Sequence, residues 1–352
     1  MTTLSMLAAP ASDEEQASVA PLPWRQMVWV TWRQHRLALS GVATLLGVLA
    51  LGFSLAGVHL HHVYSAAIAC RPASSFACGE RVSSFNNTFS FLANGVIPQA
   101  VPVLIGAFLG APVIAREFET GTYRFAWTQG FGRRRWTLAK LVLLAATVTA
   151  ATAAISVLVS WYYGPYFATG NQSLSLSEMS PFNPGLFDLR GVSLAAWTLT
   201  AFAVGALAGT LVRRVVPAIA ASLALYAGLA FGTGTFLREH YLTPLVTSRL
   251  DLPGSAWVIN QQWLTRAGRP ISETALGQIL QQGAPAQFAG KGGVPKSLDA
   301  WQYLVRHGYT QLTTYQPASR FWPFQWIEGG WLLALSVLLI ATTAWLVRRR
   351  AA

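Results

Sequence analysis

The sequence predicts an all-α integral membrane protein with six transmembrane helices. Hydrophobic residues make up 53 % of the chain and charged residues only 11 %, and the mean hydropathy is +0.40. Ordinary soluble domains carry roughly 25 % charged residues. The composition therefore excludes a soluble globular enzyme, a disordered protein and a coiled coil. With only two cysteines, the chain also cannot form a disulfide-rich scaffold or a four-cysteine zinc site.

Six segments reach the about 20 apolar residues that a membrane-crossing helix needs. They run over Leu37–Val58, Ile97–Ala115, Leu141–Tyr162, Val192–Leu211, Val216–Phe236 and Trp326–Val347. Only the last contains a charged residue, Glu328, at its start. Transporters driven by protons or ions place ionisable groups in the membrane, so we expect any transport to draw energy from another subunit. Glu328 is either a proton-relay carboxylate or, as we favour, one stabilised by the helix dipole.

Lys and Arg gather in four short segments. The N-terminal segment, the loop after span two, the link between spans four and five, and the C-terminus hold 14 of the 25 Lys and Arg residues. The clearest markers are Arg133–Arg135, Arg213–Arg214 and Arg348–Arg350. By the positive-inside rule these segments and both termini are cytoplasmic. The net charge of +12 thus mostly reflects the orientation of the helices in the membrane, and we expect no nucleic-acid partner.

Two segments precede the first span. Residues 1–23 are rich in Ala, Ser and Pro, and we expect them to be disordered. Residues 24–36 interleave Trp and Val with Arg and Gln at helical spacing, which predicts an amphipathic helix on the membrane surface. The equally open alternative is the inner aromatic belt of span one. We expect span one to be retained, because this leader is long and acidic for a cleaved signal peptide.

The first outer loop, His59–Val96, carries both cysteines. Cys70 and Cys78 lie outside in this topology, where disulfides persist, so we predict that they form a bridge. A histidine cluster precedes them, comprising His59, His61 and His62. Three imidazoles can bind zinc or copper, but no carboxylate is nearby in sequence, and we favour interface histidines and no metal site.

The last outer loop, residues 237–325, is about 90 residues long and is expected to pack on the membrane helices. One predicted helix starts at Ser272 and another at Ser297, the latter ending at Gly308, because Ser and Gly are suitable caps. The first helix would place Leu276, Ile279 and Leu280 on one face, and the second would place Trp301, Leu304 and Val305 on one face.

Pairs of glycines four residues apart occur in three spans: Gly106 and Gly110, Gly205 and Gly209, and Gly228 and Gly232. Such pairs let helix backbones approach closely in lipid. We expect them to pack helices within the chain or between protomers, and not to form a ligand site. The chain also lacks the phosphate-binding pattern GxxxxGK[ST], so we expect no enzyme active site and no bound cofactor.

Residues 115–140, the connection after span two, mix charge with aromatic side chains, a composition typical of protein contacts. An acidic start is followed by a Gly-Thr turn, then by arginines, and finally by a lysine where span three begins. The residues that we single out are Glu117, Phe118, Glu119, Gly121, Thr122, Arg124, Arg133, Arg134, Arg135 and Lys140. The alternative is an ordinary positive-inside connection.

With this segment and the six-span topology, the chain resembles the membrane permease subunit of ABC-2-type exporters. A tail segment, residues 317–328, also resembles a subgroup of actinobacterial-type permeases. The resemblance implies that residues 115–140 dock a separate ATP-binding subunit, with Glu117 as a polar contact or helix cap and Gly121-Thr122 as the turn. It implies that ATP and Mg bind on that partner, and that the permease pairs with an identical or related permease in the cell membrane.

The predicted organisation is therefore a disordered segment (1–23), a surface helix (24–36), spans one to five with the coupling loop (37–236), an extracytoplasmic subdomain (237–325), and the sixth span with a cytoplasmic tail (326–352). The expected function is that of an ABC exporter permease. The alternatives are a membrane sensor or scaffold whose outer loop binds a ligand and, less favoured, a polytopic membrane enzyme.

Overall fold

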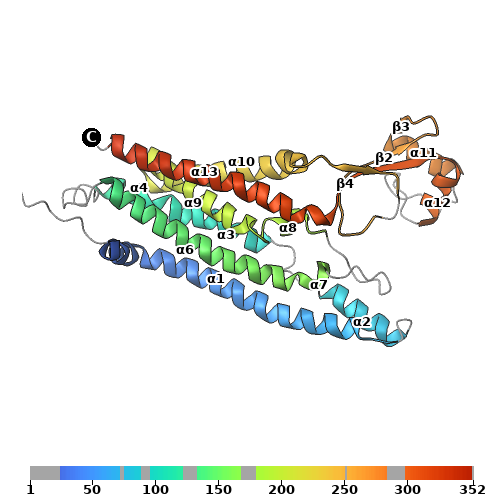
Figure 1. The fold of residues 1–352 in the computed structure, drawn as a ribbon, viewed down its shortest axis with the longest axis horizontal. Helices are drawn as coiled ribbons and strands as arrows, with labels where there is room; N and C mark the ends of the chain where they lie inside the picture. The colour runs from blue at the N-terminus through green and yellow to red at the C-terminus, as the bar shows by residue number, and fades with distance from the viewer. Residues whose placement is uncertain are drawn as a thin grey trace, which may run out of the picture.

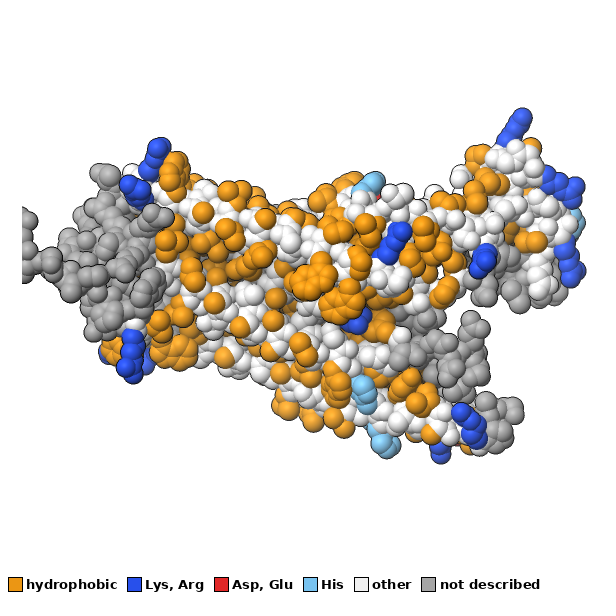
Figure 2. Space-filling model, viewed as in Figure 1, with side chains coloured by type: hydrophobic (Ala, Val, Ile, Leu, Met, Phe, Trp, Pro, Cys, Tyr) orange, Lys and Arg blue, Asp and Glu red, His pale blue; other side chains and the backbone are white. Residues whose placement is uncertain are grey.

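A computed structural model of the chain describes residues 24–71, 75–88, 96–121, 133–167, 180–249, 252–283 and 298–350. Within these ranges, six helical segments are long and apolar enough to cross a membrane. They form an elongated bundle with a small sheet beyond one end (Figure 1). Hydrophobic side chains cover the middle of the face in Figure 2, with Lys and Arg at both ends. The six expected spans and a multi-pass membrane protein are confirmed.

The bundle has two distinct ends. We call the end where α1 (Trp24–Ile68) begins and α13 (Phe321–Arg350) finishes the terminal end, and the opposite end the sheet end. Residues 24–36, expected as a separate surface helix, are continuous with span one in α1. Figure 1 shows these dark-blue turns end-on, whereas the rest of α1 runs lengthwise. Trp29 and Trp32 are more than half exposed there, as an interfacial face requires.

Helix α2 (Phe76–Asn87) lies beside the sheet-end part of α1 and is joined to it by the disulfide Cys70–Cys78. The predicted bridge is confirmed. Removing it by Cys70→Ser should lower the free energy of unfolding by about 2–4 kcal/mol, because the unfolded chain regains loop freedom. Thermal unfolding of the purified protein, with and without reductant, measures the effect. A free thiol in the untreated protein would contradict the prediction.

Span two is irregular at its centre. Helix α3 (Val96–Ile105) passes into a π-helical turn, η2 (Gly106–Gly110), and then into α4 (Pro112–Thr120). Pro112 has no N–H to donate, and the chain widens by one residue before it: the N–H of Ala111 donates to the carbonyl of Gly106 at 2.9 Å. Such single-turn widenings often occur at functional positions.

Helix α9 (Ser193–Val212) is the most deeply buried span and forms the centre of the bundle. It contacts helices on every side: α3, α4, α6 (Arg133–Tyr162), α10 (Val215–Gly232) and α13. Span five continues past α10 through a π-turn, η4 (Thr233–Leu237), and a 3-10 turn, η5 (Arg238–His240). Short helices α7 (Gly164–Phe167) and α8 (Pro184–Phe187) lie between spans three and four.

The segment between spans five and six contains an antiparallel sheet, so the expected all-α class is wrong there. Strands β1 (Leu245–Thr247), β2 (Trp257–Leu264), β3 (Pro270–Ile271) and β4 (Thr310–Gln316) pair in the order β1-β4-β2-β3. Strand β2 has Trp, Val and Ile, and β4 has three Thr and a Tyr. These residues favour strands and are the sequence signal for the sheet.

Both helices expected in this segment are present, as α11 (Glu273–Gly283) and α12 (Leu298–Arg306). Ser272 caps α11, since its Oγ accepts the N–H of Ala275 at 3.2 Å. The small core contains the expected Leu276, Leu280 and Leu304 together with Trp263 of β2. Val305, placed on the same face as Leu304, is 47 % exposed and does not join this core. The side chain of Trp301 lies outside the described residues.

Candidate functional site

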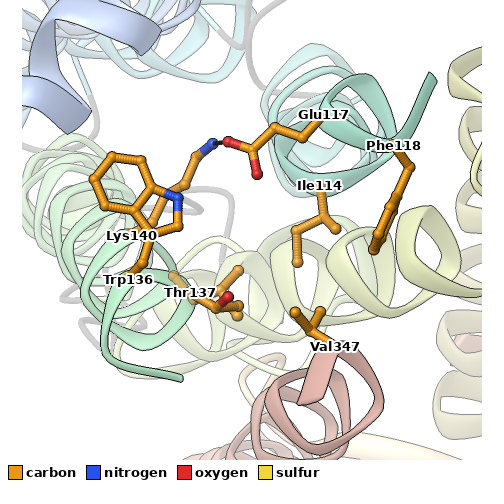
Figure 3. A pocket seen from close by; sticks show the side chains of 8 residues that line it. Ile114, Glu117, Phe118, Trp136, Thr137, Lys140 and Val347 are labelled. Carbon is orange, nitrogen blue, oxygen red and sulfur yellow. Dashed lines mark hydrogen bonds and ion pairs between the residues drawn. The ribbon is translucent and has the colours of Figure 1, made fainter. Parts of the chain in front are cut away.

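The acidic end of α4 meets the start of α6 at the terminal end of the bundle. Glu117 Oε1 and Lys140 Nζ lie 2.5 Å apart, and their side chains are 22 % and 4 % exposed. Figure 3 shows the pair beside a small cavity lined by Ile114, Phe118, Trp136, Thr137, Leu141 and Val347. Its volume is about 10 Å³, close to that of one water. The geometry is that of a closed joint among α4, α6 and α13, and not of a substrate site.

Glu119 makes a second connection from α4. Its Oε2 accepts the backbone N–H of Val215 at 3.0 Å, the first residue of α10, whose N-cap Arg214 makes no side-chain hydrogen bond. A carboxylate is favourable at a helix N-terminus, where N–H groups lack partners. The capping role considered for Glu117 therefore belongs to Glu119, while Glu117 forms the ion pair.

The turn between α9 and α10 also contacts α4. Arg213, with φ of 60°, is the one non-glycine residue with positive φ in the described part of the chain. Its guanidinium lies 5.5 Å from the centre of the Phe118 ring, a distance typical of cation–π contacts. Three consecutive residues of α4 thus hold α6 and the α9–α10 turn together.

Helix α4 ends at Gly121, which has φ of +70°. Glycine adopts this left-handed conformation without a steric cost. Helices α4 and α6 take up more of residues 115–140 than expected, because α4 continues to Thr120 and α6 starts at Arg133. Of the predicted contact residues, Thr122 and Arg124 lie outside the described residues. Arg133, Arg134 and Arg135 form the first turn of α6, and their side chains are likewise not described.

Two of the three glycine pairs face each other. A Cβ added to Gly106 would lie 2.6 Å from the carbonyl oxygen of Ala201 in α9. In the other direction, a Cβ added to Gly205 of α9 would lie 2.2 Å from the carbonyl oxygen of Gly106. Gly110 and Gly209 are equally close to backbone oxygens of the facing helix. Span two and α9 therefore touch backbone to backbone, as small residues permit in membranes.

A matched pair of substitutions tests this contact. Gly205→Ala should destabilise the protein by about 1–3 kcal/mol, because backbone atoms of span two cannot move aside. Gly47→Ala in span one is the control, since a Cβ there has no atom within 4 Å. The melting temperatures of the two variants in the same detergent measure the difference. Equal melting temperatures would contradict the close approach.

The sheet end contains a buried charged cluster that sequence reasoning missed. Arg238 donates to both oxygens of Glu328, through Nη2 at 2.9 Å and Nε at 3.0 Å, and through Nη2 to Oδ1 of Asp188. The side chains of Arg238 and Glu328 are 4 % and 0 % exposed. Glu328 also accepts from Trp197 Nε1 at 2.9 Å and the Tyr241 hydroxyl at 3.2 Å. Span five thus carries a buried charge, Arg238, where none was expected, and Glu328 of span six is its partner.

The buried position of Arg238 was not predicted because span five is longer than its apolar run. Its helical path continues through η4 and η5 to His240, whereas hydropathy placed its end at Phe236, before Arg238. Glu328, expected to be stabilised by its own helix start, instead lies inside α13 and pairs with this arginine. Signals for the pairing were present in the two residues themselves, since lone charges of opposite sign at the edges of apolar spans are potential partners.

The tail segment 317–328 fixes α13 to the start of α9. Gln325 Oε1 accepts the N–H groups of Val192 and Ser193, both at 3.0 Å, and the Ser193 hydroxyl at 2.9 Å. Gln325 Nε2 donates to the carbonyl of Phe187 at 2.9 Å. Phe321 and Phe324 pack nearby with Phe182 and Phe187. This segment therefore closes the junction of spans four and six.

The histidines at the end of span one interact with span three. His61 Nε2 lies 3.0 Å from the carbonyl oxygen of Trp161, and the two rings stack at 4.7 Å. His59 and His62 are exposed. No group of three or more His, Cys, Asp or Glu residues is placed to hold a metal ion in the described part of the chain.

Comparison with known proteins gives one family. The sequence model of the family described as "ABC-2 membrane transporter related" matches residues 24–238. This range is more than half of the 352 residues. The match contains all spans up to Arg238 and ends before the sheet. No match was found among curated proteins or among solved structures.

Proposed function

The chain belongs to the ABC-2 membrane transporter related family, and from this premise we propose that it is the permease subunit of an ATP-driven exporter. In this proposal the terminal end faces the cytoplasm, the sheet end faces outward, and two copies or relatives associate. Permeases of this family generally pair with ATP-binding subunits. ATP and Mg are bound and used by that partner, and this chain supplies the pathway.

The joint built by α4 is the observation that carries the docking proposal. Glu117 holds α6 through Lys140, and Glu119 holds the start of α10. A force applied to the segment that follows Gly121 therefore reaches three helices through short, partly buried contacts. Buried charge pairs are costly to separate, so these helices are expected to move as one body. This is what a coupling element requires.

The predicted pairing of protomers has a separate support. The Gly228 and Gly232 face of α10 has no atom of the described chain within 4 Å of an added Cβ. Most of span five is exposed in the single chain. We propose that this face approaches a second permease.

Co-purification tests the proposal directly. The tagged full chain is solubilised in mild detergent from its native membrane, and the proteins that accompany it are identified and quantified. We expect a stoichiometric ATP-binding-cassette ATPase. Recovery of the chain alone, where other ABC complexes remain intact, would overturn the permease proposal.

Glu117→Ala tests the coupling role within the assembled complex. We expect the complex to form but its transport to fall by about tenfold or more, because the loss of a buried ionic partner loosens the α4–α6 joint. Glu80→Ala is the matched control, since Glu80 is an exposed carboxylate on α2 at the opposite end. Normal transport by Glu117→Ala would show that the joint does not transmit the ATPase movement.

One observation favours the alternative of a ligand-binding sensor. A cavity of about 610 Å³ lies beside β1, lined by Leu245, Arg249, Pro253, Tyr315 and other residues. This volume falls in the range of about 300–1,000 Å³ of ligand sites. If the co-purified partner were a kinase or response regulator, this cavity would become the candidate input site.

A further inference from the structure

A second cavity adjoins the buried charged cluster. It has a volume of about 180 Å³ and lies between α3, α9 and α10 at the sheet end. Its polar wall is formed by Asp188 and Gln99, and its aromatic wall by Trp197 and Tyr226. Ala230 of α10 completes one side. We call it the Asp188 cavity.

The charges beside this cavity do not balance. Arg238 carries one positive charge, whereas Asp188 and Glu328 together carry two negative charges when ionised. Glu328 is saturated, because Arg238, Trp197 and Tyr241 all donate to it. A net negative charge is expensive in a low-dielectric environment unless a cation or a proton compensates it.

Asp188 is the carboxylate that meets the cavity. Its side chain is 32 % exposed, whereas Glu328 is fully buried. Arg238 donates to one of its oxygens, and Glu328 is a second side-chain hydrogen-bond partner of the same carboxyl group. Because Asp188 also lines the cavity, a cationic group bound there would lie next to this carboxylate.

The aromatic wall is suited to the same kind of partner. The rings of Trp197 and Tyr226 lie 5.6 Å apart with an interplanar angle of 75°. Because Trp197 Nε1 is held by Glu328, the orientation of the indole is fixed. The two rings pack edge to face on each other, and both line the cavity beside Asp188. Aromatic rings next to a carboxylate suit an ammonium group, since the ring quadrupole and the charge both attract a cation.

We propose that the Asp188 cavity binds the ammonium head of an organic cation, and that such amphipathic cations are substrates of the exporter. The second half rests on the proposed function. The cavity is smaller than the roughly 300–1,000 Å³ of sites that enclose drug-sized ligands. It therefore receives the charged head, while the apolar remainder of the molecule stays among the membrane helices.

Protons compete with the cation at this site. Burial raises the pKa of Asp188 to about 7, with Glu328 acting in the same direction and Arg238 opposing it. The other titratable group facing Asp188 is Tyr226. Protonation below this pKa removes the negative charge that attracts the ligand. Affinity for a cation should therefore fall when the pH drops from about 8 to about 6, provided that Asp188 is the site.

The first test is binding to the purified full chain in detergent, followed by tryptophan fluorescence. The probes are choline and its neutral isostere 3,3-dimethyl-1-butanol, which have the same shape and differ in charge. We expect choline to bind about tenfold or more tightly than the isostere. Equal affinity of the two probes, or binding of neither, would overturn the proposal.

Two variants connect this binding to the cavity. Asp188→Asn should abolish the preference for choline and its pH dependence. Ala230→Leu should block binding by filling the space while leaving every charged group in place, so it remains informative if Asp188→Asn fails to fold. The control is Glu239→Gln, a carboxylate at the same end that pairs with His240 and does not line the cavity. Unchanged choline affinity in Ala230→Leu would place the binding elsewhere.

The two proposals fail separately. Choline binding to the isolated chain does not depend on an ATPase. Charge-selective binding without a co-purified ATPase would therefore support the cation site and contradict the exporter proposal. A co-purified ATPase without charge-selective binding would support the exporter proposal and contradict the cation site. Transport of a fluorescent quaternary ammonium dye by the complex, lost in Ala230→Leu and kept in Glu239→Gln, would support both.

Discussion

Arg238→Met should lower the free energy of unfolding by about 3–5 kcal/mol, because it leaves two carboxylates near each other without their cation. Glu328 is fully buried and shares Arg238 with Asp188. The methionine keeps most of the volume of the arginine stem, so the effect reports on charge and not on a cavity. The measurement is thermal unfolding of the full chain in detergent.

The control for this experiment is Arg306→Met, which removes an exposed arginine at the same end. Single surface substitutions usually change stability by less than about 0.5 kcal/mol. Adding Glu328→Gln to Arg238→Met should recover part of the loss, since it removes one of the uncompensated charges. If Arg238→Met and Arg306→Met melted at the same temperature, the cluster would have no role in stability.

At the terminal end, Lys140→Met should also cost about 3–5 kcal/mol, because it leaves Glu117 with an unpaired charge in a partly buried place. Glu117 is 22 % exposed, so water compensates its unpaired charge only in part. Glu117→Leu alone should be similarly harmful, since a buried ammonium remains. The double variant Glu117→Leu/Lys140→Met should be more stable than either single variant.

The double-mutant cycle isolates the interaction from the effects of each side chain. Melting temperatures of the four proteins give the coupling energy, which we expect to be at least about 1 kcal/mol for a buried pair. Additive losses would mean that the two groups do not interact. Glu80→Ala again provides a carboxylate substitution far from the pair.

The six spans and the disulfide followed from composition and spacing, because each depends on residues close together in the sequence. Glu117 and Lys140 were both singled out, although nothing in the sequence showed that they pair. The Arg238–Glu328 pair was missed because hydropathy ends a span at its first charge, whereas a buried partner 90 residues away allows the helix to continue. The sheet was missed because pairing of β2 with β4 depends on contacts about 50 residues apart.

Gln325 has a consequence for how the protein is made. Spans are synthesised and inserted in order. The two N–H groups at the beginning of α9 therefore lack their partner until Gln325, in the last span, has been inserted. Until α13 is inserted, the central helix has an unsatisfied N-terminus, which is costly away from water. Nascent chains that stop before the sixth span should therefore be recognised by membrane quality control and degraded, so the final span acts as a checkpoint for biogenesis.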